Sequence, residues 1–209
     1  MTTTTAPVAH EAGMAGTVVM DLDGMVRVPR AGAVAAAILR LGIGFVYLWA
    51  FIRQGFGVGY TNQVVNQSAP SPSEVQYHWD FTYDADNGWI TSGFQHSPTE
   101  GYIDNNTHGP LAPIVQNLPT GLIDFVWMFA IGGLGIALML GICSRIAGWG
   151  GLLLNLMIWF SVFPPSTNPV IDAEHFMFAF IIFLLMWLHA SNYWGIGRWW
   201  RAKTPAFLH

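Results

Sequence analysis

The chain has 209 residues, of which 53% are hydrophobic and only 10% are charged, and its mean hydropathy is +0.41. Soluble domains carry about 25% charged residues, so this composition indicates a membrane protein. A net charge of −4 leaves no basic patch for nucleic acid, and the single cysteine, Cys143, excludes a disulfide or a cysteine zinc site within the chain.

The composition changes near residue 30. Residues 1–30 are rich in Thr and Ala and hold no apolar run of signal-peptide length, so we expect a mobile cytoplasmic tail. Residues 31–52 are apolar and long enough to cross a bilayer core about 30 Å thick. This stretch is too long for the core of a cleaved signal peptide, which predicts an uncleaved first transmembrane helix.

Arg40 interrupts this first apolar stretch. It lies about 14 Å from the cytoplasmic end of the stretch, at 1.5 Å per helical residue. Asn155 lies at an equal depth in the third predicted helix, so we expect that the two side chains can form a hydrogen bond. An ionisable residue at this depth is a candidate functional group. The alternative is that Arg40 extends towards the cytoplasm or only locks two helices together.

Residues 54–120 form a loop that is too long for a passive connector. Residues 77–83 alternate aromatic with polar side chains, and Asn87-Gly88 and Trp89-Ile90 follow. This pattern predicts a small β-hairpin with its turn at Asn87-Gly88 and an aromatic face on the bundle mouth or the membrane interface. Residues 84–88 depart from the calcium-loop pattern, and the histidines follow no compact ligand spacing, so we predict no metal site.

Three further apolar stretches predict helices at residues 121–142, 146–163 and 173–190. The first two are separated by a very short turn around Cys143, and Pro164-Pro165 ends the third predicted helix. Glycine-rich segments at 132–135 and 148–151 predict that the second and third helices pack tightly as a hairpin. The predicted fold is an all-α integral membrane protein, a four-transmembrane-helix bundle with a long extracytoplasmic loop that carries the β-hairpin.

The distribution of the eight Lys and Arg residues predicts the orientation. None lies within residues 54–144 or 146–197, whereas cations flank the first helix on its N-terminal side, occupy the short turn at Arg145 and follow the fourth helix. The positive-inside rule therefore places both termini in the cytoplasm and the 54–120 loop outside. We expect a multi-pass plasma-membrane protein with tails at 1–30 and 202–209 and a membrane domain at 31–201.

Charged residues gather at the predicted outer end of the bundle. Arg53 ends the first helix, Asp124 begins the second, and Asp172, Glu174 and His175 begin the fourth. A cation, carboxylates and an imidazole at a bundle mouth can bind an anion and move protons. Arg53, His175 and Asp124 are therefore the candidate catalytic residues, and ordinary salt bridges at a solvated interface are the alternative.

Several segments together carry a resemblance to a known family. They are residues 39–44 with Trp49-Ala50, 97–102 with Gly109-Pro110, 132–138 continuing to Ala147, 168–172 with His175, and 195–200. In this combination the chain resembles the DoxX/DoxD membrane family over roughly residues 35–201. That family includes the large subunit of thiosulfate:quinone oxidoreductase.

The resemblance implies a four-helix membrane bundle that oxidises thiosulfate to tetrathionate on the outer side and passes the electrons to membrane quinone. It also implies a separate, smaller partner subunit. Arg40, the Ser97-Pro98-Thr99 segment and His175 match motif positions of the family. We therefore take Arg40, Ser97 and Thr99, with His96, as candidate substrate-binding residues.

Two functional hypotheses follow. The first is a quinone-linked oxidoreductase for small sulfur anions, in which Arg53, His96 and His175 attract the anion, His175 or Asp124 relays protons, and quinone lies beside Trp49, Trp127 and Phe176. The acidic character of the loop counts against it, because a negative field repels dianions. The second is a non-catalytic membrane subunit whose loop docks a redox partner protein. A transporter fits less well, because four helices without an internal repeat make a poor alternating-access device.

Overall fold

The computed structural model describes residues 30–64, 77–165, 170–171, 174–205 and 208, with only the backbone described at 61–64 and 77–79. This part of the chain is mostly helical with one small sheet. The elements in chain order are α1 (Arg30–Phe56), β1 (Val58–Val64), β2 (Tyr77–Tyr83), η2 (Ala85–Asn87), α2 (Glu100–Asn106), α3 (Ala112–Val115), α4 (Thr120–Leu140), α5 (Ser144–Ser161), α6 (His175–Trp187), η3 (Ala190–Asn192) and α7 (Gly197–Lys203).

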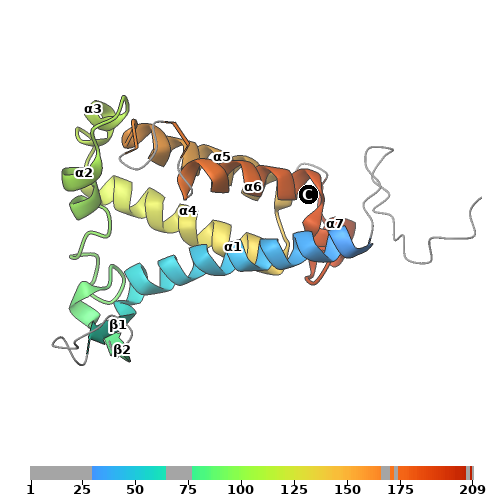
Figure 1. The fold of residues 1–209 in the computed structure, drawn as a ribbon, viewed down its shortest axis with the longest axis horizontal. Coiled ribbons are helices and arrows are strands. Elements are labelled where there is room, and N and C mark those ends of the chain that lie inside the picture. The colour runs from blue at the N-terminus through green and yellow to red at the C-terminus, as the bar shows by residue number, and fades with distance from the viewer. Residues whose placement is uncertain (1–29, 65–76, 166–169, 172–173, 206–207, 209) are drawn as a thin grey trace, which may run out of the picture.

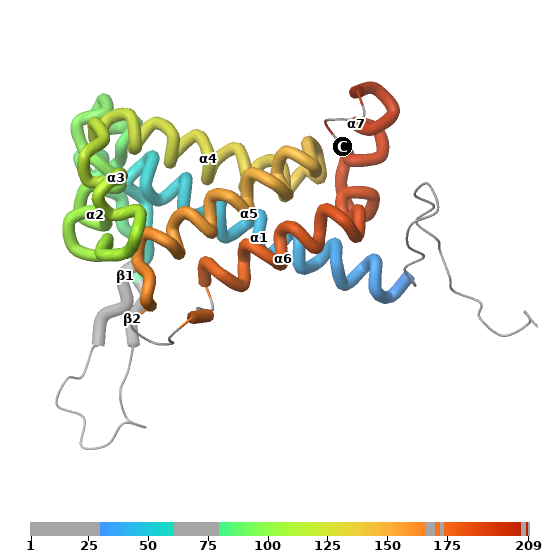
Figure 2. The backbone as a smooth tube through the Cα atoms, turned by 90° about the horizontal axis from the view of Figure 1, so that it is seen from above, coloured from blue at the N-terminus to red at the C-terminus, as the bar shows by residue number. Residues whose placement is uncertain are grey.

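Four helices run along the length of the molecule in two pairs (Figure 1). α1 lies with α4, and α5 lies with α6. We call the end where α1 ends and α4 begins the loop end, and it carries the β-hairpin, α2 and α3. We call the other the turn end, where α4 joins α5 and where η3 and α7 lie. Figure 2 shows the same arrangement from above.

The four helices predicted at 31–52, 121–142, 146–163 and 173–190 are confirmed as helices, with ends shifted by a few residues. α5 ends at Ser161, ahead of Pro164, as expected. α1 and α4 are each long and apolar enough to cross a membrane. Over their described residues, α5 and α6 do not reach that combination of length and apolar character. α2, α3 and α7 were not anticipated.

Glycines determine which helices approach closely. On α4, Gly132 packs against Phe51 and Gly135 against the backbone of Leu48, both on α1. On α5, Gly148 packs against Met186 of α6. With no Cβ, these residues let two backbones come together over a continuous contact.

The predicted tight packing of α4 against α5 through these glycines is therefore wrong, because Gly132 and Gly135 face α1 and Gly148 faces α6. Gly133 and Gly150 have open space where a Cβ would lie. Between α4 and α5 the bundle leaves an apolar groove of about 440 Å³, which is lined from the level of Phe129 and Leu154 to the α4–α5 turn at Cys143.

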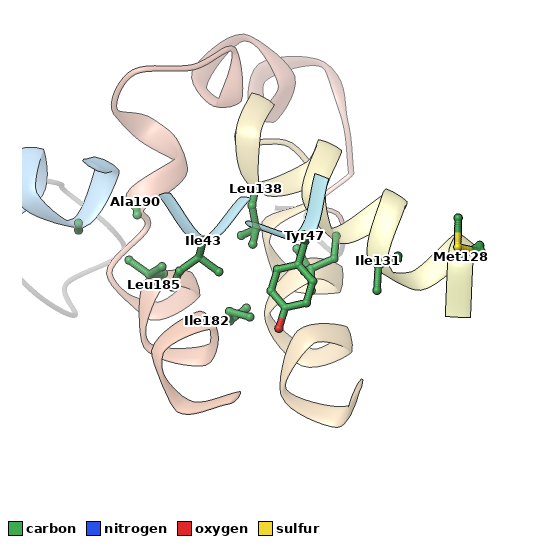
Figure 3. Packing of buried hydrophobic residues seen from close by; sticks show 11 residues of the cluster. Ile43, Tyr47, Met128, Ile131, Leu138, Ile182, Leu185 and Ala190 are labelled. Atoms are coloured by element: carbon green, nitrogen blue, oxygen red, sulfur yellow. The ribbon is translucent and has the colours of Figure 1, made fainter. Parts of the chain in front are cut away.

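The core lies where the two pairs meet, and Figure 3 shows its side chains converging from three helices. Ile43 and Tyr47 come from α1, Met128 and Ile131 from α4, and Ile182 from α6. All are at most 7% exposed, so they form a dry contact between the pairs.

The predicted β-hairpin exists, but its assigned partner strand was wrong. β2 pairs antiparallel with β1, the segment that directly follows α1. Asp84 caps a 3-10 turn at 85–87, so Asn87-Gly88 does not connect two strands. The backbone N–H groups of Trp89 and Ile90 donate to the carbonyls of residues 54 and 55, and so are not available to a strand.

The remainder of the loop folds across the loop end of the bundle. The backbone N–H groups of His108 and Gly109 both donate to the carbonyl of Ser161, at the end of α5. Gly109 approaches the carbonyl of Phe160 so closely that no side chain fits there. We call residues 96–119 the cap, because they connect the start of α4 to the end of α5.

The contact of α1 with α4 yields a first prediction. A Cβ at residue 135 would lie 2.6 Å from the backbone nitrogen of Leu48, so Gly135→Ala should lower the free energy of unfolding by about 1–3 kcal/mol through overpacking. Gly133→Ala, on the same helix, meets nothing within 4 Å and should leave stability unchanged or raise it by up to about 1 kcal/mol. Thermal unfolding of the two purified variants in detergent checks this, and equal melting temperatures would contradict it.

Candidate functional site

Asp124 is the charged residue of the loop end with the most defined surroundings. It lies in the second turn of α4 and is only 4% exposed. Its Oδ1 accepts hydrogen bonds from Ser97 Oγ at 2.8 Å and from Thr99 Oγ1 at 2.6 Å. The structure thus brings together three of the residues nominated from sequence.

The local fold of the cap explains why the two hydroxyls meet there. The backbone N–H groups of Thr99 and Glu100 donate to Ser97 Oγ at 3.4 and 3.0 Å, immediately before α2. A serine in this position satisfies N–H groups at the start of a helix and leaves its hydroxyl proton free to donate elsewhere. Ser97 therefore fixes the start of α2 and points its proton at Asp124.

The second carboxylate oxygen of Asp124 has a different environment. No residue in the described part of the chain donates a hydrogen bond to Oδ2. One oxygen is thus held in place while the other remains available to a proton or to a donor group. Such a carboxylate has the capacity of a general base or a proton carrier.

Among the described residues, no hydrogen bond or ion pair joins the other nominated residues of the loop end to Asp124. Arg53 is exposed in the last turn of α1, and His96 is exposed ahead of Ser97. His175 is half-buried at the first position of α6. Asp172 lies outside the described residues, and no group of three His, Cys, Asp or Glu in the described part could hold a metal ion.

Arg40 lies at the turn end and not with Ser97 and Thr99. Its guanidinium is 2% exposed and donates to four backbone carbonyls: Leu138, Met139 at 3.2 Å, Tyr193 at 3.0 Å and Trp194 at 2.7 Å. About 20 Å of α4 separates Leu138 from Asp124, at 1.5 Å per residue. Arg40 and the Ser97–Thr99 segment therefore do not form one substrate site.

The chemistry at Arg40 is that of a helix cap. Leu138 and Met139 belong to the last turn of α4, whose carbonyls have no partners within the helix and carry partial negative charge. A buried cation compensates that charge, and its fork of donors also holds residues 193–194. The sequence indicated Arg40 as a candidate because of its depth in the predicted helix. It could not predict that the partners of Arg40 are backbone carbonyls.

The predicted hydrogen bond between Arg40 and Asn155 is wrong. Asn155 Oδ1 accepts from the hydroxyl of Tyr47 at 2.7 Å, and its Nδ2 donates to the carbonyl of Gly151 at 2.7 Å. Asn155 does tie the first helix to the third, but its partner on α1 is Tyr47 and not Arg40. Tyr47 lies two helical turns beyond Arg40, and its polar tip reaches Asn155 across the core.

Sequence reasoning also missed Gln54. Its Oε1 accepts from the indole N–H of Trp127 at 2.7 Å and so ties the end of α1 to the first turns of α4. The sequence feature that could have indicated Gln54 was its position as a polar residue just after the first predicted membrane span.

The aromatic residues expected beside quinone have three separate environments. Trp49 stacks on Phe45 and Tyr60, and Phe176 packs against Trp159 at 5.2 Å between ring centroids. Trp127 instead binds Gln54.

The apolar α4–α5 groove fits an isoprenoid chain, but Cys143 supplies its one side-chain heteroatom. The groove also lies on the face of α4 opposite to Asp124, because Gly133 is nine residues away, two and a half turns. The described residues therefore fit the tail of a quinone and do not assemble a site for its head group.

The carbonyl contacts of Arg40 yield a second prediction. Arg40→Met should leave buried carbonyls without donors, at about 1–3 kcal/mol each, and should lower the melting temperature sharply. Arg145→Met changes an exposed cation at the same end of the bundle and should have little effect. If Arg40 served a substrate instead, Arg40→Met would melt like the wild type, so thermal unfolding without substrate separates the two roles.

Comparison of the chain with protein-family models, with curated proteins and with solved structures found no match.

Proposed function

We propose that the chain crosses a membrane four times through α1, α4, α5 and α6, with both termini in the cytoplasm and the loop end outside. The length and apolar character of α1 and α4 support this arrangement. Large apolar side chains on the outward faces of all four helices add support, among them Phe45, Phe129, Leu153 and Leu184, which are 54–74% exposed where a soluble protein would bury them. The cations Arg145, Arg198, Arg201 and Lys203 lie at the turn end, which the positive-inside rule assigns to the cytoplasm.

Cys143, the chain's one cysteine, tests this topology. It lies in the α4–α5 turn, so a membrane-impermeant maleimide should label it in inside-out vesicles and not in right-side-out vesicles. Burial raises the pKa of the Cys143 thiol, and because the thiolate is the reactive form, labelling should accelerate as the pH is raised. Asp104→Cys in a Cys143→Ser background should give the reverse pattern. Labelling of both positions from one side would contradict four crossings.

We further propose that this membrane subunit belongs to a quinone-linked oxidoreductase for small sulfur anions such as thiosulfate, as the resemblance to the DoxX/DoxD family implies. The supporting observation is the buried carboxylate of Asp124 at the loop end, with one oxygen oriented by two hydroxyls and the other open. Arg53, exposed at the same end, supplies a positive charge that can attract a dianion.

The proposed reaction balances as follows. Two thiosulfate dianions lose one electron each and join through a new sulfur–sulfur bond to give tetrathionate. Quinone, as the acceptor, takes up the two electrons together with two protons from the aqueous phase and becomes quinol. Asp124 would hold and pass a proton at Oδ2, while Ser97 and Thr99 keep Oδ1 in place. A smaller partner subunit completes the proposed enzyme.

A second function is favoured by a specific observation. Among the described residues, neither Arg53 nor His96 forms a hydrogen bond or an ion pair with Asp124, and every hydrogen bond of Arg40 is to a backbone carbonyl. The polar groups then serve structure, and Asp124 holds the cap on the bundle. In that case the chain is a non-catalytic membrane subunit, and the cap presents a docking surface to a redox partner protein.

Two substitutions of Asp124 separate these functions. Asp124→Asn keeps an oxygen that accepts from Ser97 and Thr99 but cannot carry a proton, whereas Asp124→Ala removes both properties. If Asp124 relays protons, both variants should lose quinone reduction by roughly 100-fold or more. If it only holds the cap, Asp124→Asn should retain activity and Asp124→Ala should lose it. The measurement is thiosulfate-dependent quinone reduction by membranes that contain the chain and the smaller subunit.

Asp104→Asn is the matched control, because Asp104 is an exposed carboxylate in α2 of the same cap. It should leave the rate unchanged. Arg53→Ala and His175→Ala extend the test: a loss of activity in folded variants would assign them to the reaction. Absence of thiosulfate-dependent quinone reduction in the wild-type membranes would contradict the oxidoreductase and leave the accessory role.

A further inference from the structure

The β1–β2 hairpin has one aromatic face that no other part of the described chain covers. Tyr60 pairs directly with Phe81, and Val58 pairs with Tyr83. Positions that alternate along paired strands share a face, so these four side chains lie together. Tyr60, Phe81 and Tyr83 are 60%, 59% and 61% exposed. Three large aromatic rings that water reaches on one face of a two-stranded sheet indicate an interaction surface.

The aromatic face continues into α1. Ring centroids are 6.3 Å apart from Phe45 to Trp49, 5.8 Å from Trp49 to Tyr60 and 5.5 Å from Tyr60 to Phe81. Phe45 belongs to the outward face of α1 and is itself 57% exposed. The row therefore runs without a break from the side of a membrane-length helix onto the hairpin. We call these four residues the aromatic row.

The hairpin turns back along α1 instead of extending it. Tyr60 follows the end of α1 by four residues but contacts Trp49, which precedes that end by seven. In Figure 1 the hairpin accordingly lies beside the end of α1, on the side away from α4, α5 and α6. It is thus placed next to the lipid-facing side of the helix and not above the bundle mouth.

The length of α1 indicates the depth of this contact. Its 27 residues span about 40 Å, roughly 10 Å more than the hydrocarbon core of a bilayer. Trp49 lies about 10 Å before the end of α1, at 1.5 Å per residue. With the start of α1 at the cytoplasmic boundary of the hydrocarbon core, Trp49 falls at the outer boundary between hydrocarbon and head groups. Trp and Tyr are enriched at this boundary, because their rings are apolar and their N–H and O–H groups remain hydrated.

The charges around the hairpin indicate which lipid surface it fits. Arg53 is exposed nearby, but Asp84 and Asp86 are exposed directly after β2. The opposite face of the hairpin carries Gly59, Thr82 and a further carboxylate, Asp80. Carboxylates repel anionic head groups, so burial of the aromatic rings and not charge attraction provides the binding energy.

From these observations we infer that the β1–β2 hairpin lies on the outer surface of the bilayer, with the aromatic row inserted among neutral, zwitterionic lipids. This inference rests on the proposed four-crossing arrangement, which makes the outward face of α1 a lipid contact. The hairpin then acts as an interfacial anchor that holds the outer end of α1 at a fixed depth.

Depth-dependent fluorescence quenching tests the inference. Phe81→Cys and Thr82→Cys, each in a Cys143→Ser background, place an environment-sensitive fluorophore on the two opposite faces of the hairpin. In phosphatidylcholine vesicles, the label at position 81 should shift its emission to shorter wavelength and be quenched by lipids spin-labelled near the head group. The label at position 82 should be quenched by aqueous iodide instead. Added anionic lipid should not strengthen the lipid quenching at position 81.

A label on α1 separates failure of the inference from failure of the topology. Phe45→Cys in the same background should be quenched by lipids spin-labelled deep in the chain region. Deep quenching at position 45 with iodide quenching at both hairpin positions would overturn the hairpin contact alone. Iodide quenching at all three would overturn the membrane arrangement as well. A blue shift at position 81 that disappears when the protein is diluted in lipid would assign the face to a second copy of the chain, and this too would overturn the inference.

Discussion

The structure depends on the burial of one charge. Arg40 reaches across from α1 to carbonyls at the end of α4 and to residues 193–194, which are separated from it by 98 to 154 positions in the chain. A guanidinium away from water needs partners for its donors. Nη1 and Nη2 of Arg40 find them on backbone carbonyls, whereas its buried Nε has no hydrogen-bond partner among the described residues. This requirement fixes how far α1 slides along α4. It also fixes where the chain goes after α6.

Two further buried polar groups repeat this arrangement at other levels of the bundle. The Tyr47–Asn155 bond joins α1 to α5 near the middle, and Asp124 joins α4 to the cap at the loop end. In an apolar surrounding, hydrophobic contact alone does not discriminate one helix register from another, whereas an unsatisfied polar group is costly. Asp124 differs from the others because no described residue donates a hydrogen bond to its second oxygen, which is why the functional proposal centres on it.

The sequence was sufficient for the features that depend on composition along one segment. Apolar length located the four long helices, and Pro164 marked the end of the third. The wrong predictions concern which residues contact each other. These contacts depend on the direction in which a side chain points around its helix axis. Gly132, Gly133 and Gly135 are nearly adjacent in the chain, yet two face α1 and one faces open space. In the same way, Arg40 was predicted to bind Asn155 because the two lie at equal depth. Tyr47, however, is the residue on the side of α1 that faces Asn155. Residues 77–83 were predicted to pair with the segment that follows them because Asn87-Gly88 is a strong turn signal. In the structure, Asp84 instead caps the turn at 85–87, and residues 89–90 donate to free carbonyls at the end of α1.

The groove between α4 and α5 makes the packing of this side of the bundle sensitive to the lipid or detergent around it. The two helix pairs are each closely packed, and in the proposed membrane arrangement the groove between α4 and α5 is open to the apolar chains around the bundle. Acyl chains in a bilayer are long, flexible and ordered along the helix axes, and they fill such a furrow better than the shorter tails of most detergents. In that arrangement, the α4–α5 side is the part of the molecule whose packing depends most on the surrounding lipid. Lipid retained through purification would preserve the spacing of the two pairs, while stripping it would remove one of the surfaces against which they are packed.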